Sequence, residues 1–134
     1  MSRKCFQPKE LFASQPWGFS QVVVAEKNKL VHISGKVAWN SEGQCLAQTL
    51  EGQFKQVMQN IFHALHSVNA TAENIQMLRL YIPNFQPGKD ANLISKLLID
   101  TFGPENQPAS TWLGVQALAQ PEYLIEIDCV AAIN

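Results

Sequence analysis

The sequence predicts an α+β domain in which two helices cover one face of a mixed sheet of five or six strands. Two segments have the 3.6-residue apolar period of amphipathic helices, and β-branched or alternating runs lie before, between and after them. The strand-helix-strand passages are long enough for right-handed crossovers, which place both helices on the same side of the sheet. A chain of 134 residues has the size of one domain, so residues 1–134 are expected to fold as a single unit.

The first third of the chain is predicted to be extended. Strands are expected over 6–12, over 19–25 with its run of three valines, and over 30–36. Residues 27–29 read as a tight turn, so the second and third strands are expected to pair as a hairpin. A further turn is expected over 40–43.

The clearest helix begins with Thr49 as its N-cap, has Glu51 in the first turn and runs to about Val68. Apolar residues fall on one side of this helix at helical spacing. They are Leu50, Phe54, Val57, Met58, Ile61, Leu65 and Val68. Polar residues occupy the opposite side, so the helix is expected to lie on a sheet.

The rest of the chain alternates between strand and helix patterns. Strands are expected over 75–82, 111–118 and 123–132. A second helix is expected from Asp90, as its N-cap, to Phe102, where a Gly-Pro pair ends it.

Two helices can cover only one face of such a sheet. Met77, Tyr81 and Trp112 are assigned to the other face, where they would form an apolar patch that monomers seldom leave in water. The sequence therefore predicts a homo-oligomer packed through its sheets.

The charge balance argues against several classes of function. Ten Lys and Arg residues against 11 Asp and Glu give a net charge of −1, which lacks the basic field that nucleic acids or acidic membranes attract. No apolar run reaches the roughly 20 residues of a membrane span. Three cysteines far apart in the sequence fit reduced thiols, so a cytoplasmic protein without nucleic-acid or membrane partners is expected. No nucleotide-binding or serine-hydrolase motif is found, and no cofactor is expected.

Two pairs of residues are candidates for chemistry. His63 and His66 are three positions apart, but no third residue has the spacing of a metal ligand. We therefore favour histidines that complement the dipole at the helix end over a metal site. Glu126 and Asp128 project from one face of an apolar strand, where two carboxylates are costly unless they are solvated, paired or functional. An edge strand with one wet face fits this pattern, and so does a carboxylate that orients or deprotonates a water.

Five segments, taken in order and at their spacing, resemble the RidA (YjgF) family, also described as reactive intermediate or imine deaminases and as endoribonuclease L-PSP. They are Pro16-Trp-Gly-Phe-Ser-Gln21, Leu30-Val-His-Ile-Ser-Gly-Lys-Val37, Gln56-Val-Met-Gln-Asn60, Pro108-Ala-Ser-Thr-Trp-Leu-Gly-Val115 and Leu124-Ile-Glu-Ile-Asp128. The resemblance spans nearly the whole chain. It implies a chorismate-mutase-like fold with a six-stranded mixed sheet and two helices on one face. It also implies a homotrimer packed through the sheets, with three clefts at the subunit interfaces.

The resemblance also implies a set of site residues. In active members an Arg within a Pro-Ala-Arg segment holds the substrate carboxylate. A Glu on the last strand positions the water that hydrolyses a 2-imino acid to a 2-keto acid and ammonia. Glu126 matches this Glu, and Ser34 and Gly35 match a Ser-Gly pair that lines the cleft.

Three cleft positions depart from the family pattern. Ser110 stands where the carboxylate-binding Arg belongs, Phe19 replaces a Tyr, and Trp112 stands where many members have Cys or Val. A Ser hydroxyl cannot replace the charge of a bidentate Arg, so 2-imino acids should bind less well by about 2–4 kcal/mol. An aromatic, less charged cleft suits a neutral or aromatic ligand. Arg79 or a neighbouring subunit is the remaining source of a cation.

Three functions therefore stay open. The first is an enzyme that hydrolyses an imine or enamine without the amino-acid carboxylate, with Glu126 as the catalytic residue and a substrate site shaped by Phe19, Ser34, Gly35, Ser110 and Trp112. The second is a non-catalytic trimer that binds a small ligand or another molecule. The third, and least favoured, is an endoribonuclease or translation inhibitor, for which the chain offers no basic groove.

Overall fold

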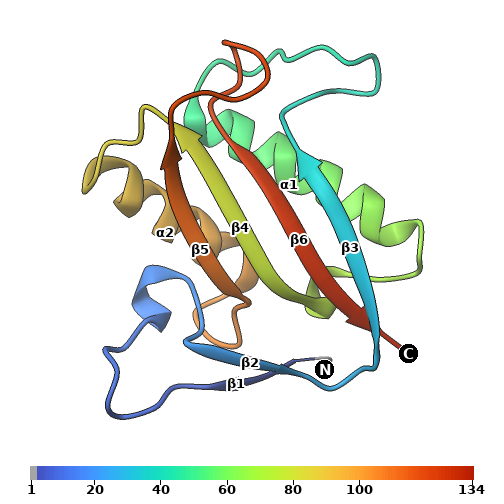
Figure 1. The fold of residues 1–134 in the computed structure, drawn as a ribbon, viewed down its shortest axis with the longest axis vertical. Coiled ribbons are helices and arrows are strands. Elements are labelled where there is room, and N and C mark those ends of the chain that lie inside the picture. The colour runs from blue at the N-terminus through green and yellow to red at the C-terminus, as the bar shows by residue number, and fades with distance from the viewer. Residues whose placement is uncertain (1–2) are drawn as a thin grey trace.

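A computed structural model describes residues 3–134 as a mixed α+β fold, which confirms the expected class (Figure 1). The elements, in chain order, are β1 (Arg3–Phe6), the 3-10 helix η1 (Gln15–Trp17), β2 (Val22–Ala25), β3 (Lys29–Lys36), α1 (Leu50–His66), the 3-10 helix η2 (Ala72–Asn74), β4 (Ile75–Pro83), α2 (Lys89–Phe102), β5 (Ala109–Val115) and β6 (Glu126–Ile133).

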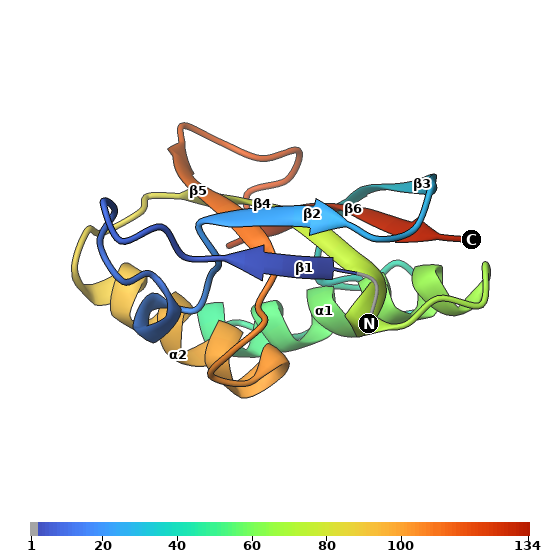
Figure 2. The same ribbon diagram turned by 90° about the horizontal axis from the view of Figure 1, so that it is seen from below.

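The main sheet has four strands in the order β3-β6-β4-β5, and it is mixed because β4 and β5 are parallel while the other pairs are antiparallel. Both α-helices lie on the same side of this sheet, as the crossovers predicted (Figure 2). The core fills the space between helices and sheet. Its fully buried large apolar side chains are Phe54, Ile61, Leu65, Ile75, Leu78, Leu80, Ile82, Ile94, Leu98, Ile125 and Ile127. The opposite side of the sheet, called the open face below, carries no helix of the described chain.

The prediction of one six-stranded sheet is wrong, because β1 and β2 form a separate two-stranded ribbon. The hairpin expected between 19–25 and 30–36 does not form, since β2 pairs with β1 and β3 pairs with β6. The first strand is also shifted, from 6–12 to Arg3–Phe6. The ribbon lies at the end of the main sheet where β4 and β5 begin (Figure 1).

Arg3 explains where this ribbon lies. Its side chain is buried, and Nε donates to the Asn106 carbonyl at 2.8 Å. Nη1 donates to three more carbonyls, those of Ala72, Glu73 and Ile75, at 3.0, 3.0 and 2.7 Å. Hydrogen bonds from a charged donor are strong, and together these four attach β1 to the start of β4 and to the loop before β5. We infer that this attachment outweighs the tendency of the turn at 27–29 to pair β2 with β3 as a hairpin.

The helix starts follow local capping. Thr49 caps α1 as predicted, since its Oγ1 accepts from the Gly52 N–H at 3.0 Å. The prediction that Asp90 caps α2 is wrong, because Gly88 is the N-cap and Asp90 lies in the first turn. The Asp90 carboxylate still accepts from the Gln86 N–H at 2.7 Å, so it satisfies a backbone donor just before the helix. Neither α-helix of the described chain is long and apolar enough to span a bilayer.

The buried side chain of Gln53 fixes the loop before β6. Its Nε2 donates to the Glu122 carbonyl and its Oε1 accepts from the Leu124 N–H, both at 2.8 Å. Because these backbone groups bond to a side chain of α1, they do not enter the sheet. The strand expected over 123–132 therefore begins at Glu126.

Candidate functional site

Glu126 is the first residue of β6 and points to the open face. Ile127 and Cys129 are buried in the core, so Glu126 and Asp128 project together on the other side, as the alternation predicted. Glu126 is half-buried, and within residues 3–134 its carboxylate accepts no hydrogen bond. Both of its oxygens therefore stay available to a ligand or a water.

Gly35 lies directly against the Glu126 carboxyl group. The pairing of β3 with β6 is irregular between Ile33 and Lys36, and Ser34 and Gly35 are the two residues inside this irregularity. A Cβ at Gly35 would stand 2.9 Å from Glu126 Cδ and closer still to Oε2, so any larger residue there would displace the end of the Glu126 side chain. The structure thus brings Gly35 and Glu126 together, with Ser34 as the neighbour of Gly35 in the chain.

Asp128 differs from Glu126 because both of its oxygens are engaged. Arg79 Nε donates to Oδ1 at 2.8 Å and the Tyr81 hydroxyl donates to Oδ2 at 3.0 Å. Loss of hydration and the bond to this carboxylate raise the pKa of Tyr81 above its ordinary value. Tyr81 is the register partner of Glu126 across β4 and β6. A cation and a phenol therefore lie next to Glu126 on the open face without occupying its carboxylate.

The other three predicted site residues meet at β5. Trp112 Nε1 donates to Ser110 Oγ at 2.9 Å, and the ring of Phe19 contacts the indole edge-to-face with centroids 5.9 Å apart. The ring of Phe12 contacts Phe19 in turn, with centroids 6.2 Å apart, and Phe12 is 63% exposed. Sequence reasoning missed Phe12, because its range was assigned to a strand and nothing local linked it to residue 19. The hydroxyl of Ser110 is thus already bound by the indole of Trp112.

The two groups lie on opposite faces of the sheet. The β4–β5 register pairs Ser110 with Leu78 and Trp112 with Leu80. In a parallel pair such partners point to the same side, and both leucines are buried beneath the helices. The assignment of Trp112 to the open face is therefore wrong. One chain alone does not bring Glu126 and Ser110 together.

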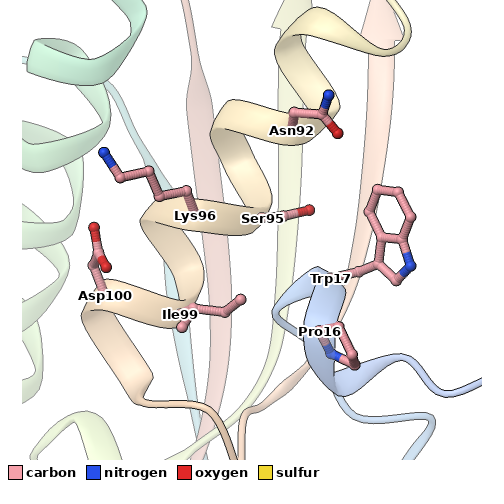
Figure 3. A pocket seen from close by; sticks show the side chains of 7 residues that line it. All are labelled: Pro16, Trp17, Asn92, Ser95, Lys96, Ile99 and Asp100. Atoms are coloured by element: carbon pink, nitrogen blue, oxygen red, sulfur yellow. The ribbon is translucent and has the colours of Figure 1, made fainter.

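The cavity between η1 and α2 has a volume of about 480 Å³, and none of the six predicted site residues lines it. Pro16 and Trp17 form one wall, and Ser95 and Ile99 face them from α2 (Figure 3). A smaller hollow of about 250 Å³ beside β3 and α1 includes Ser34 among its lining residues. The predicted site residues thus contribute to separate surfaces of the single chain.

Residues suited to metal or thiol chemistry are dispersed. His63 and His66 lie in the last turn of α1, where the helix dipole favours positive charge. Residues 3–134 contain no group of three or more His, Cys, Asp or Glu that could hold a metal ion. Burial raises the pKa of Cys129 to about 12, so this thiol is protonated and inert at neutral pH.

Comparisons with known proteins agree with the fold described above. The model of the family described as Endoribonuclease L-PSP matches residues 12–133. The solved structure of YyfB, a conserved Rid family protein from Yersinia pestis, is 35% identical, with a TM-score of 0.91 over 99% of this chain and 100% of its own.

Two more distant structures share the fold alone. YyfA from Yersinia pestis is 22% identical, with a TM-score of 0.70 over 98% of this chain and 99% of its own. A YjgF/YER057c/UK114 family member from Mycobacterium tuberculosis is 20% identical, with a TM-score of 0.66 over 98% of this chain and 100% of its own. No curated protein matches the chain.

Proposed function

The chain belongs to the Endoribonuclease L-PSP (Rid) family, and from that premise we propose that it binds a reactive imine or enamine, or a related small metabolite, and hydrolyses it with Glu126. The observation that carries this proposal is the Glu126 carboxylate, which is half-buried against Gly35 and accepts no hydrogen bond within residues 3–134. A carboxylate in such a place can orient a water and take up its proton.

The proposed reaction is the hydrolysis of a C=N bond. Water adds to the imine carbon while Glu126 takes a proton from it and returns that proton to the nitrogen. Glu126 then moves the hydroxyl proton of the resulting carbinolamine to the nitrogen while the C–N bond breaks, which releases ammonia and leaves a carbonyl group. Water is the only co-reactant that this balance needs, so the step requires no cofactor. We assign this activity to the cytoplasm, in keeping with the charge and the three free cysteines.

The proposed site lies between copies of the chain. Within one chain Glu126 and Ser110 are on opposite faces of the sheet, so a cleft that contains both must take one from each of two copies. Ser110 lies on β5, which is an edge strand of the main sheet. In a homotrimer packed through the open faces, three such clefts would form where this edge of one copy meets the open face of the next, and the apolar side chains of the open faces would be covered. Leu30 and Leu113, which are 60% and 44% exposed, are among the residues that gain from this burial.

The proposed substrate has no amino-acid carboxylate. The Ser110 hydroxyl is already bound to Trp112, and Phe19 adds a second ring instead of a charge. Arg79 lies on the same face as Glu126, but its Nε is held by Asp128. A neutral or aromatic imine that contacts the indole therefore fits this surface better than a 2-imino acid.

The test is ammonia release from enzymatically generated imines, with and without a carboxylate. We expect wild type to hydrolyse neutral or aromatic imines, Glu126→Gln to lose at least about a hundredfold in rate, and Ser110→Arg to gain activity on 2-imino acids. Glu42→Gln, a change in an exposed turn, is the matched control and should leave the rate unchanged. Full activity of Glu126→Gln would overturn the proposal.

A second candidate is a trimer that binds its ligand without turnover. The observation in its favour is that Trp112 bonds to Ser110 and contacts the ring of Phe19 edge-to-face, so these three side chains are already engaged with one another. Quenching of Trp112 fluorescence by a metabolite that is not consumed would support this candidate, with Trp112→Phe as the control. An endoribonuclease stays the least favoured candidate, because a net charge of −1 provides little attraction for RNA.

A further inference from the structure

We propose that the pocket beyond the ends of β4 and β5 binds a neutral planar ligand that carries an N–H group next to a carbonyl, as in a carboxamide or a nucleobase edge. The pocket has a volume of about 350 Å³, within the range of small-molecule sites. None of the six residues of the proposed imine site lines it. This inference therefore goes beyond the proposed function and does not depend on it.

The polar lining consists of uncharged groups. Asn84 follows β4, Gln116 follows β5, and Gln120 lies in the loop before β6. Within residues 3–134 none of these three amide side chains makes a hydrogen bond. Each offers two donors and one acceptor, which match a ligand that presents a donor beside an acceptor. No charged side chain lines the pocket, so an ionic ligand would lose hydration there without gaining a partner.

The apolar lining suits a flat ligand. The rings of Pro83 and Pro121 and the phenol of Tyr123 contribute rigid surface between the three amides. Such side chains can contact the face of a ring while the amides bond to its edge. In pockets of this size, apolar side chains usually supply most of the contact and a few polar groups fix the orientation of the ligand.

The backbone of the pocket is held in place before any ligand arrives. Tyr123 is only 8% exposed, its N–H donates to the Gln120 carbonyl at 3.2 Å, and its hydroxyl accepts from Trp39 Nε1 at 2.6 Å. Gln53 holds the neighbouring backbone on both sides of Tyr123. Asn84 has a φ of +54°, a left-handed conformation that Asn adopts more readily than most residues. Little ordering of the backbone is therefore required on binding, which favours affinity.

The bond between Trp39 and Tyr123 provides a local probe. The chain has three tryptophans, so each indole N–H gives one signal in the nitrogen-15 NMR spectrum, assigned with Trp39→Phe and Trp112→Phe. We expect millimolar uracil or nicotinamide to shift the Trp39 signal saturably and to leave the Trp112 signal in place. Benzoate, a charged analogue of nicotinamide, should shift neither.

The arms of this titration distinguish the outcomes. Saturation by uracil alone assigns a nucleobase edge, saturation by nicotinamide alone assigns a carboxamide, and either result supports the proposal. No shift with either compound overturns it. A shift of Trp112 without Trp39 also overturns it, because Trp112 reports on the proposed imine site, and that result leaves the proposed function standing.

Variants test the amides directly. Gln116→Glu and Asn84→Asp keep the size of each side chain but add a charge, and each should weaken binding by about tenfold or more. Gln59→Glu, on the exposed side of α1, is the matched control and should bind as wild type does. Folding is checked by the unchanged signals of Trp17 and Trp112. Wild-type affinity in both folded pocket variants would overturn the proposal.

Discussion

Gly35 contributes to the site only through the room that it leaves. The missing Cβ lets the Glu126 carboxyl group lie against β3. We expect Gly35→Ala to displace the Glu126 carboxyl group and, because that side chain can move, to lower the free energy of unfolding by only about 1 kcal/mol or less, as measured by urea denaturation. In a Glu126→Ala background the same change should cost much less, because the atoms that it meets are gone. An equal cost in both backgrounds would mean that Gly35 serves another purpose.

The pKa of Tyr81 depends on Asp128, whose carboxylate is bonded to both Arg79 and Tyr81. Loss of hydration and the bond to Asp128 raise the pKa of Tyr81, so the folded protein favours the neutral phenol. The stability that follows from this shift is present below the ordinary pKa of about 10 and is lost as the pH rises through the raised pKa.

The shift can be measured by ultraviolet absorbance of tyrosinate in a Tyr123→Phe background, where Tyr81 is the remaining tyrosine. We expect Asp128→Asn to lower the pKa of Tyr81, because the neighbouring negative charge is removed. Glu42→Gln, in a distant turn, should leave it where it is in the parent variant. An unchanged titration in Asp128→Asn would mean that the carboxylate does not act on the phenol.

At the scale of elements, local signals were sufficient for the helices but not for strand pairing. Thr49 and the apolar stripe after it define α1, and both lie within one segment of sequence. The choice of partner for β2 depends instead on Arg3, whose carbonyl partners are 69 to 103 positions away in the chain. No turn signal between β2 and β3 contains that information, so the hairpin prediction failed although both strands exist.

The same limit applies to the candidate site. Alternation predicts that Glu126 and Asp128 share a face, because that relation lies within one strand. It does not predict which face of the sheet Trp112 occupies, because that depends on the register with Leu80. The shared face of Glu126 and Asp128 could therefore be predicted from sequence, whereas the division of the candidate residues between two faces required the structure.

The ribbon of β1 and β2 should loosen on its own when Arg3 is removed. Arg3→Met leaves four carbonyls without their donor, and for the Ile75 carbonyl, whose hydrogen bond is buried, this loss costs about 1–3 kcal/mol. We expect amide hydrogen exchange in β2 to accelerate by at least about tenfold while the amides of β4 and β6 keep their protection. Lys4→Met, at the exposed neighbouring position, should change neither. Equal acceleration in all strands would show that Arg3 supports the whole fold and not the ribbon alone.

For the whole molecule, the open face determines whether the chain can act alone. Val130 lies near its centre, in register with His32 on β3 and Met77 on β4. A lysine at this position would place a charge in the middle of the proposed contact between sheets, where desolvation makes it costly. Val24, on the ribbon, is 50% exposed, so Val24→Lys is a matched control.

We expect light scattering to give wild type and Val24→Lys a mass of about three protomers, and Val130→Lys a mass near the 14.9 kDa of one protomer. Ammonia release should be lost together with the assembly, although Val130 is not a residue of the site, because Glu126 and Ser110 would then no longer meet across two copies. A wild-type mass of one protomer would contradict the trimer. If Val130→Lys is monomeric and keeps full activity, Glu126 can act without a second copy of the chain. The open face would then have to be covered by another partner.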